Sequence, residues 1–318
     1  MSTPGPRPST RGAPASVPDL APQELRVLVA VAREGGFSAA GAALGTTQSA
    51  VSHAVRTLER KLGVVLFDRG RHGARPTAAG ERAVAHARRV LRMLEALVAE
   101  ARGAGAGPDG GDTAAGPLRV AAFRSAALHL LPPALERLAA RHPGLEPTVR
   151  VVREVGAGVA GEVAAGRADI GIATLGTAVP LPPGVLGEVL LEEPYALVHP
   201  AGHPDPRSLP LVDWTENCSS STRRWWAAQD WLPTATVRAE DDGAVLSMVG
   251  IGLGMAVMPV LSLSGAPLTV EITALGPGRP TRRIGHVTTP ESARTLAVRS
   301  LVRELRAVRH DAVRHLAV

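Results

Sequence analysis

The sequence predicts two kinds of structure in one chain: a small helical region with a β-hairpin, then a larger α/β region of two lobes. Three observations support this prediction. Apolar residues recur at three- and four-residue steps through residues 21–102, as they do on amphipathic helices. A run rich in Gly, Ala and Pro then breaks the pattern at residues 103–117. Beyond it, short apolar strands alternate with helices, which is typical of an α/β fold with a parallel sheet.

The composition limits the class of protein. With 318 residues and 45% hydrophobic content, the chain can fold into two or three domains with real cores. Its one cysteine, Cys218, allows no disulfide framework within the chain, and this favours a reducing, cytoplasmic location. Residues 1–20 lack the apolar segment of a signal peptide and are expected to be a disordered tail. The uncharged stretch 243–270 is interrupted by Gly and Pro, so we expect no membrane association.

The positive charge is concentrated at the N-terminal end. Residues 1–118 carry 15 Lys or Arg against 10 Asp or Glu, whereas residues 119–318 carry 20 against 19. A basic module attached to a near-neutral one suggests that the first third of the chain binds a polyanion.

Residues 21–78 are expected to form a winged helix-turn-helix. The segment "PQELRVLVAVARE" has one apolar face, Ser38 is the expected N-cap of a second short helix, and Thr47 that of a third. The run "VVLFDR" then reads as a strand and "GRHGARP" as a basic turn. A long helix is expected to begin at Thr77. Its residues 79–102 are the expected linker and dimerisation element, because the apolar stripe is wider than one packing face needs.

The third helix "QSAVSHAVRTLERKL" carries amide, hydroxyl, imidazole and guanidinium groups opposite its apolar stripe. Such groups match base edges and phosphate oxygens, and a winged domain of this type inserts its third helix into the major groove. The predicted DNA contacts are Ser38, Thr47, Gln48, Ser49, Ser52, His53, Arg56, Arg69, Arg71 and Arg75. A solvated helix face would show the same residues individually, but the wing arginines and the charge asymmetry favour double-stranded DNA as the partner.

The α/β region is expected over residues 118–318, after a flexible linker at 103–117. It should begin with the strand "LRVAAF" and a single following helix, "LHLLPPALERLAARHP". Lobe I should comprise residues 118–197 and 283–318, and lobe II residues 198–282, so that two crossings create a hinged cleft. Ligands of such folds lie at the carboxyl ends of strands and at helix N-termini. The candidates at such positions are Arg124, Ser125, Thr174, Ser219, Ser220, Ser221, Thr222 and Asp242.

These hydroxyl groups and helix amides suit a small, polar ligand, and Arg124 would favour a carboxylate. Each candidate could instead be an ordinary helix cap. The tryptophans of "RRWWAAQDW" could line the ligand or pack the second lobe, and packing is the favoured interpretation. Cys218 is interpreted as a small buried residue, because a disulfide switch would need a second thiol.

The segment "GGFSAAGAALGTTQSAVSHAVRTLERKLGVVLFDRGRHGARPTAAGE" resembles the DNA-binding domain of LysR-type transcriptional regulators. The matching positions are Phe37, Ser38, Leu44, Gln48, Ser49, Val51, Ser52, Leu58, Glu59, Leu62, Gly63, Leu66, Phe67, Arg69, Thr77 and Gly80. Farther on, "LLPPALERLAARHP", "VAGEVAAGRADIGIA" and "MVGIGLGMAVMP" resemble the family's effector domain in the right order. His53, where the family often has Arg, Gly41, where Ala is commoner, and the long linker depart from the pattern.

The resemblance implies a bacterial repressor or activator that works as a homodimer or a dimer of dimers, with RNA polymerase as a partner if it activates. It also implies an effector domain like type 2 periplasmic binding proteins, with an inducer between the lobes, and no catalytic residue, metal or cofactor. Two alternatives remain open. The second region could be an interaction domain without a ligand, or the chain could be an enzyme or solute-binding protein with the same two-lobed fold. We find no G-x-S-x-G, H-E-x-x-H or Walker motif, which disfavours an enzyme.

Overall fold

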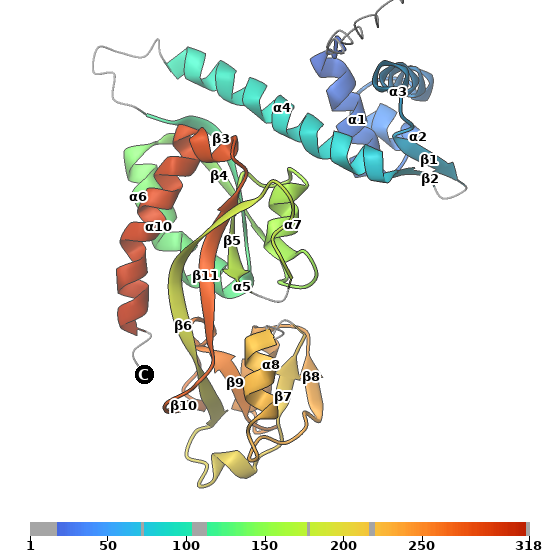
Figure 1. Ribbon diagram of the computed structural model, residues 1–318. Helices are drawn as coiled ribbons and strands as arrows, with labels where there is room; N and C mark the ends of the chain where they lie inside the picture. Colours follow the sequence, from blue (N-terminus) through green and yellow to red (C-terminus); the bar gives the residue numbers. More distant parts are fainter. Residues whose placement is uncertain (1–17, 71–72, 104–112, 177–178, 216–219, 316–318) are drawn as a thin grey trace, which may run out of the picture. The chain divides into compact units, whose positions relative to one another are not determined.

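The computed structural model describes residues 18–70, 73–103, 113–176, 179–215 and 220–315 (Figure 1). The chain divides into two compact units, Met1–Leu91 and Arg92–Val318, hereafter the N-terminal and C-terminal units. The predicted tail lies outside the described residues up to residue 17.

The N-terminal unit contains three helices and a two-stranded hairpin: α1 (Pro22–Glu34), α2 (Phe37–Ala43), α3 (Gln48–Leu62), β1 (Phe67–Gly70) and β2 (Gly73–Pro76). In α1 and α3 the buried residues recur at helical spacing, so each of these helices turns one apolar stripe inward. Leu28, Leu58, Leu66 and Phe67 are large buried side chains of this core. The predicted winged helix-turn-helix fold is confirmed.

Local signals fix the ends of α3. The Oγ1 atom of Thr47 accepts a hydrogen bond from the backbone N of Ala50 at 3.2 Å, so Thr47 is the predicted N-cap. Gly63 ends the helix in the left-handed region, with φ at 69°. The predicted cap at Ser38 is wrong. The N-cap of α2 is Gly36, so the helix begins two residues earlier than predicted, and Ser38 lies exposed in its first turn.

Gly41 allows α2 to approach the turn that leads into α3. A Cβ atom on Gly41 would lie 2.9 Å from the carbonyl oxygen of Thr46 and 3.2 Å from the backbone N of Gln48. Glycine weakens a helix relative to alanine, so the sequence suggested only a cost at this position. The structure shows the compensation, which is a close backbone contact that no larger residue permits without a shift.

The wing begins later than the sequence suggested. Val64 and Val65 are exposed in the turn after α3 rather than part of a strand. Glu59 shapes this turn, because its Oε1 atom accepts hydrogen bonds from the backbone N atoms of Leu66 at 2.9 Å and Phe67 at 3.4 Å. The predicted basic turn also contains a strand, because β2 pairs antiparallel with β1 along its whole length.

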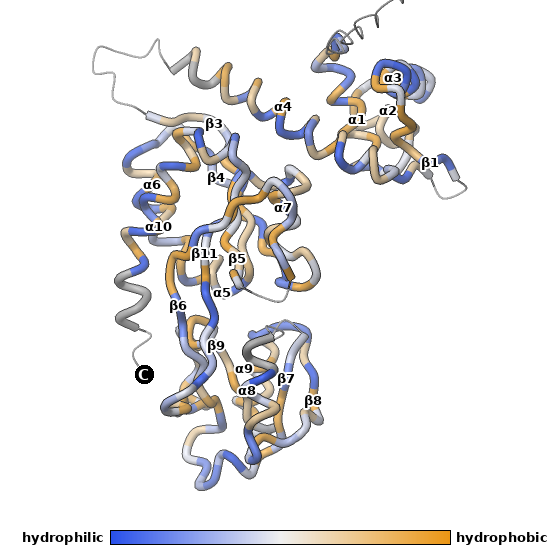
Figure 2. Tube along the Cα trace, viewed as in Figure 1, coloured by the Kyte–Doolittle hydropathy of each residue, from blue (hydrophilic) through white to orange (hydrophobic). Residues whose placement is uncertain are grey.

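The long helix α4 (Ala78–Gly103) follows, capped by Thr77, whose Oγ1 atom accepts a hydrogen bond from the backbone N of Gly80 at 3.0 Å. Hydrophobic and hydrophilic residues alternate along it in Figure 2. Val84 and Ala87 pack into the core of the N-terminal unit. The helix then exposes a set of apolar side chains, the α4 stripe, which comprises Val90, Met93, Leu97 and Val98.

A seven-stranded sheet forms the frame of the C-terminal unit. Its strands are β3 (Ala115–Ala122), β4 (Gly144–Val151), β5 (Ile170–Leu175), β6 (Leu186–Pro200), β9 (Ala256–Pro259), β10 (Val270–Ala274) and β11 (Thr281–Thr288). The order is β10-β6-β11-β5-β3-β4, with β9 also on β6. The sheet is mixed rather than parallel as predicted. The strand β11 runs antiparallel to β5 and β6. It does so because β6 leads the chain out of the first lobe and β11 leads it back.

The strand β6 belongs to both lobes. Up to Pro194 it pairs with β11, and from Tyr195 onward it pairs with β9 and β10. The return crossing lies where Thr281 of β11 pairs with Pro194. Both crossings therefore come a few residues before the predicted positions near 198 and 283. The sequence could not show this, because β6 changes partners without interrupting its extended backbone.

Lobe I consists of β3, β4, β5 and their neighbours in the sheet with α5 (Arg124–His129), α6 (Leu131–Arg141), α7 (Gly158–Ala164) and α10 (Leu296–His315). Lobe II adds β7 (Val212–Trp214) and β8 (Val237–Ala239), a parallel pair, and α8 (Ser220–Ala227) and α9 (Asp242–Gly250) to β9 and β10. In Figure 1, α6 and α10 lie together on one side of the sheet and α7 on the other. The predicted two-lobed α/β fold is confirmed.

Two predicted boundaries in lobe I are wrong. The linker expected to run to residue 117 ends earlier, because β3 begins at Ala115 and pairs with β4 from there; residues 104–112 lie outside the described part. The single helix expected after β3 is two helices, divided at Leu130. Two prolines follow that break, and proline donates no hydrogen bond but suits the first turn of a new helix.

A buried carboxylate joins α6 to α10. Glu304 is 1% exposed, and its oxygens lie 2.9 Å from Nε of Arg137, 3.1 Å from Nε of Arg303 and 3.3 Å from Nε of Arg141. Burial alone raises the pKa of Glu304, but the hydrogen bonds from Arg137 and Arg303 outweigh it and hold the pKa below its usual range. The carboxylate is therefore ionised where α6 and α10 meet.

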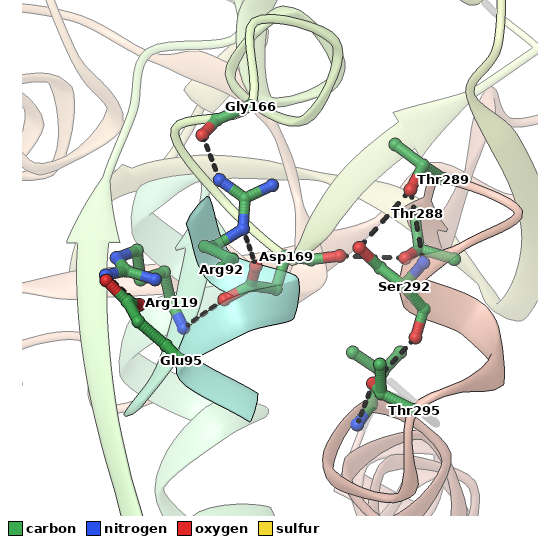
Figure 3. A network of polar contacts seen from close by, with 10 residues as sticks. Arg92, Glu95, Arg119, Gly166, Asp169, Thr288, Thr289, Ser292 and Thr295 are labelled. Atoms are coloured by element: carbon green, nitrogen blue, oxygen red, sulfur yellow. Dashed lines mark hydrogen bonds and ion pairs between the residues drawn. The ribbon is translucent and has the colours of Figure 1, made fainter. Parts of the chain in front are cut away.

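A second polar network surrounds the start of β5 (Figure 3). The carboxylate of Asp169 accepts a hydrogen bond from the backbone N of Arg119 at 2.8 Å and pairs with Arg92 of α4. Thr288 of β11 donates to the backbone oxygen of Asp169 at 2.8 Å, and Arg92 also donates to the backbone oxygen of Gly166. The part of α4 that belongs to the C-terminal unit is thereby held on lobe I.

Candidate functional site

The N-terminal unit presents one polar helix face to solvent. The buried side of α3 faces the core, and the predicted contacts on the other side are exposed: Gln48, Ser49, His53 and Arg56. Thr47, at the cap, is exposed as well, and its Oγ1 atom lies 2.9 Å from Oγ of Ser49. These groups can donate to and accept from base edges, which is what an α-helix in the major groove must do.

Ser52 was predicted on this face, and that prediction is wrong. It is 5% exposed, because its position lies at the border of the apolar stripe and faces inward. Its Oγ atom lies 3.4 Å from Nη1 of Arg69, which donates the hydrogen bond. Ser52 therefore supports a wing arginine instead of meeting solvent.

Arg69 of β1 is held against the helices. Its guanidinium carbon lies 4.7 Å from the centroid of the Phe37 ring, and Phe37 packs edge-on against Phe67 with centroids 6.2 Å apart. Arg75 of β2 is exposed, whereas Arg71 lies outside the described residues. The hairpin thus carries two described arginines, one of them stacked on α2.

In the C-terminal unit, an ion pair joins the two lobes. Arg124 opens α5 of lobe I and Asp242 opens α9 of lobe II, and Nη1 of Arg124 lies 2.9 Å from Oδ1 of Asp242. The Arg124 side chain is 39% exposed and that of Asp242 only 9%. A Cβ atom on Gly243 would lie 2.6 Å from the Arg124 guanidinium, so glycine at this position leaves room for that group. Two predicted effector residues are thereby brought into direct contact.

His129 lies within electrostatic reach of this pair. Burial and the positive charge of Arg124 hold the pKa of His129 below its usual range, while Asp242 acts in the opposite direction. The imidazole is therefore neutral near pH 7 and adds no further positive charge beside Arg124.

Behind this pair, a buried cluster lies at the crossing of β6 and β11. Arg282 pairs with Glu193 on the neighbouring strand, donates to Oγ of Ser125 at 3.1 Å and stacks 4.8 Å from the centroid of Phe123. Glu193 is fully buried, and its Oε2 atom accepts from the backbone N of Leu261 at 2.6 Å. Burial lowers the pKa of Arg282, but the charges of Glu193 and its neighbours raise it above its ordinary value, so the guanidinium keeps its charge. Ser125 is directed at the crossing.

A second contact joins the lobes. Arg153, which follows β4, donates to the backbone oxygen of Glu240 at 2.9 Å and lies 3.6 Å from its carboxylate. Sequence reasoning missed Arg153 and Glu240, as well as Arg282 and Glu193. No signal in the sequence singled out the last pair, because the exposed charged residues Glu192 and Arg283 stand beside it in the same strands.

The remaining predicted effector residues are not joined to this pair. Thr174 is half-buried near the end of β5, opposite Ile284 of β11, and among the described residues it makes no hydrogen bond with Arg124 or Asp242. Ser219 and Cys218 lie outside the described residues, as do the side chains of Ser220, Ser221 and Thr222 in α8.

The tryptophans pack lobe II, as expected. Trp225 and Trp231 meet edge-on with centroids 6.4 Å apart, and with Trp226 they pack on a buried cluster that includes Tyr195 and Met255. In the described part of the chain, no helix is long and apolar enough to cross a membrane. No group of three or more His, Cys, Asp or Glu side chains there could hold a metal ion.

Two family models match the chain. The model "LysR substrate binding domain" matches residues 111–309, and "Bacterial regulatory helix-turn-helix protein, lysR family" matches residues 22–81. The first covers more than half of the sequence. The chain belongs to the LysR family. This LysR regulator is therefore a DNA-binding transcription factor with an effector-binding domain, and it is not an enzyme.

Curated relatives agree. The regulator is 35% identical over 264 residues to "Probable HTH-type transcriptional regulator LrrA" of Synechococcus elongatus, which covers 79% of this chain and 84% of the relative. It is 33% identical over 243 residues to the "Small neutral protease regulatory protein" of Streptomyces coelicolor, which covers 76% and 67%.

Solved structures share the fold. A full-length OxyR variant from Pseudomonas aeruginosa superimposes with a TM-score of 0.67 at 25% identity, over 91% of this chain and 95% of that one. LysG from Corynebacterium glutamicum, with bound effector Arg, gives 0.63 at 19% identity over 92% and 99%. CbnR in complex with its target DNA gives 0.61 at 20% identity over 91% and 99%.

Proposed function

We propose that the regulator reads its operator with the exposed face of α3. Arg56 and Gln48 are suited to bidentate contacts with guanine and adenine, and Ser49 and His53 extend the same face. The exposed hydroxyl groups of Ser38 and Thr47 and the wing arginines Arg69, Arg71 and Arg75 are assigned to phosphates, which position the helix. The observation that carries this proposal is the polar, exposed side of α3 opposite its buried stripe.

We also propose that the regulator works as a homodimer or a dimer of dimers through α4. Met93 and Leu97 of the α4 stripe are 59% and 61% exposed, and a second copy of the helix would cover them. RNA polymerase is a further partner if the regulator activates, and the cytoplasm is the compartment in which it meets its operator.

For the C-terminal unit, we propose a small polar effector with an anionic group, bound where lobes I and II meet at Arg124 and Asp242. Arg124 would receive a carboxylate, and Ser125 acts through Arg282 as a positioning residue. Thr174 and the segment Ser219, Ser220, Ser221 and Thr222 are assigned to the border of this site.

The test is to select genomic fragments with the purified full-length regulator and to footprint them across a salt series. We expect a protected site of two-fold symmetry and binding that weakens steeply with salt. Weak binding without sequence preference would contradict the proposed reading of α3. Arg56→Ala is the informative variant, because it should lose the footprint while Arg33→Ala, an exposed arginine on α1, keeps it.

A second candidate is an interaction domain that needs no ligand. The observation in its favour is that Arg124–Asp242 and Arg153–Glu240 already join the lobes. In that case Arg124→Gln would leave regulation of the target promoter unchanged under every growth condition, whereas an effector site would lose its response.

A further inference from the structure

The charges at the meeting point of the lobes are balanced. Two guanidinium groups, of Arg124 and Arg282, face two carboxylates, of Asp242 and Glu193. Resting on the effector site proposed above, we propose that the effector is a zwitterion. Its carboxylate replaces Asp242 at Arg124, and its ammonium group replaces Arg124 at Asp242.

Only one of the two pairs can be exchanged. Glu193 and Arg282 are partners on adjacent strands, and the backbone N of Leu261 and Oγ of Ser125 complete their hydrogen bonds. Glu193 is fully buried and Arg282 is 13% exposed, so a ligand would have to break the strand crossing to reach them. The Arg124–Asp242 pair, by contrast, spans two lobes and is open to solvent on the arginine side.

An anion alone is a poor replacement for Asp242. If a simple carboxylate took Arg124, the Asp242 carboxylate would lose its ion pair while 9% exposed and would keep only the electrostatic attraction of Arg282. Removing one partner from a buried ion pair is strongly destabilising, because the remaining charge has given up its water without compensation. The N-terminus of α9 favours a negative charge at this position but offsets only a fraction of that cost.

A cation alone is a less costly replacement. It would pair with Asp242 and release Arg124, whose side chain is 39% exposed and can be solvated. The structure therefore ranks three kinds of ligand: a zwitterion satisfies both groups, a cation leaves the exposed one unpaired, and an anion leaves the buried one unpaired. This order distinguishes the proposal from recognition of a carboxylate by Arg124 alone, which would place the anion above the cation.

The experiment is calorimetric titration of the full-length regulator with a panel of free amino acids, their N-acetyl forms and their amides. The acetyl group removes the positive charge, and the amide removes the negative one. We expect at least one free amino acid to bind, its amide to bind roughly 10- to 100-fold more weakly, and its N-acetyl form to bind the most weakly.

Charge-removing variants should change this preference. Asp242→Asn should bind the N-acetyl form at least as well as the free amino acid, because the variant has no buried carboxylate at this position that could lose its ion pair. Arg124→Gln should no longer distinguish the free amino acid from its amide. The matched control is Arg153→Gln, which removes a second inter-lobe contact and should keep the wild-type order. Denaturant unfolding of the C-terminal unit reports that each variant is folded.

Three outcomes overturn the proposal: an N-acetyl form that binds wild type as tightly as the free amino acid, variants that keep the wild-type order, or no binding by any free amino acid. Titration with acetate and benzoate then separates this failure from that of the effector site itself. Carboxylate binding that Arg124→Gln abolishes would preserve the anionic effector site and reject only the zwitterion. Carboxylate binding that Arg124→Gln leaves unchanged would reject both.

Discussion

Arg56 on α3 and Arg124 on α5 are both partly or fully open to solvent, yet their surroundings differ. Arg56 lies on an exposed helix face with other polar side chains, whereas Arg124 is already paired with Asp242 across two lobes. A surface that binds DNA keeps its donors displayed. A site that responds to a ligand must exchange internal contacts for contacts with the ligand. The ligand can shift the equilibrium between arrangements of the two lobes only by the difference in free energy between the old and the new contacts.

The same difference separates stability from recognition. Exposed groups on α3 contribute little to folding, because water satisfies them in the folded and unfolded chain alike. The carboxylates of Asp242 and Glu193, by contrast, were largely desolvated on folding, so removing Arg124 or Arg282 takes away the ion pair that compensates this cost. Substitutions in the two regions should therefore affect different measurements.

The largest expected effect is on folding. Glu193→Ala should lower the free energy of unfolding of the C-terminal unit by about 3–5 kcal/mol, because Arg282 would remain buried without a carboxylate. Denaturant unfolding measures this. The matched control is Glu188→Ala on the same strand, whose ion pair with Arg306 is half-exposed and should cost at most about 1 kcal/mol. Equal losses in the two variants would contradict the special role of the crossing.

The next effect is on operator binding. Arg69→Gln should weaken binding roughly tenfold and reduce the slope of log affinity against log salt by about one, because it removes one phosphate contact. A salt series of operator titrations tests this. Arg33→Gln removes the same charge from α1 and should leave the slope unchanged. An equal change in both would mean that only net charge matters.

A smaller effect concerns the presentation of α3. Gly41→Ala should destabilise the N-terminal unit by about 1 kcal/mol, since the strain of a Cβ atom 2.9 Å from the Thr46 carbonyl exceeds the gain in helix propensity. Thermal unfolding reports the change, and the exposed Ala39→Ser on the same helix should stay within about 0.5 kcal/mol. A stabilised Gly41→Ala protein would show that the turn can yield freely.

The smallest expected effect is pH dependence. Burial, together with the positive charge of Arg306, holds the pKa of His286 below its usual range. As the pH falls, His286 is therefore protonated in the unfolded chain before it is protonated in the folded chain. Stability should fall as the pH drops below about 6.5. Below about pH 4.5 the depressed pKa of Glu304 adds to the loss in the same direction. Unfolding midpoints of wild type and His286→Gln should converge in acid, and parallel curves would contradict this assignment.

Local rules predicted the N-terminal unit well. The Thr47 cap, the exposed Arg56 and the buried Leu58 all follow from spacing within one helix. Ser52 failed because it lies at the border of the apolar stripe, where a neighbour on β1 decides whether it faces inward. The linker and wing boundaries failed for a related reason, since strand pairing extends β3 and creates β2.

Long-range contacts were out of reach of the sequence. Arg124 and Asp242 are 118 positions apart, and Glu193 and Arg282 are 89 apart. The helix-start rule proposed the first pair as separate ligand contacts, but nothing in a periodic pattern states that they meet. The second pair could not be told apart from its neighbours, because Glu192 and Arg283 in the same strands are also charged but exposed.

The most direct test of the contrast between the two regions is the ratio of operator affinity to affinity for unrelated DNA, measured side by side for Arg56→Ala and Arg124→Gln. Without effector, Arg56→Ala should lower this ratio by about 5- to 150-fold, the loss of one base contact worth about 1–3 kcal/mol. Arg124→Gln should keep it within about twofold, because the inter-lobe pair touches no DNA. An equal loss in both variants, or a loss only in Arg124→Gln, would contradict the account in which the exposed face of α3 recognises DNA and the Arg124–Asp242 pair responds to the effector.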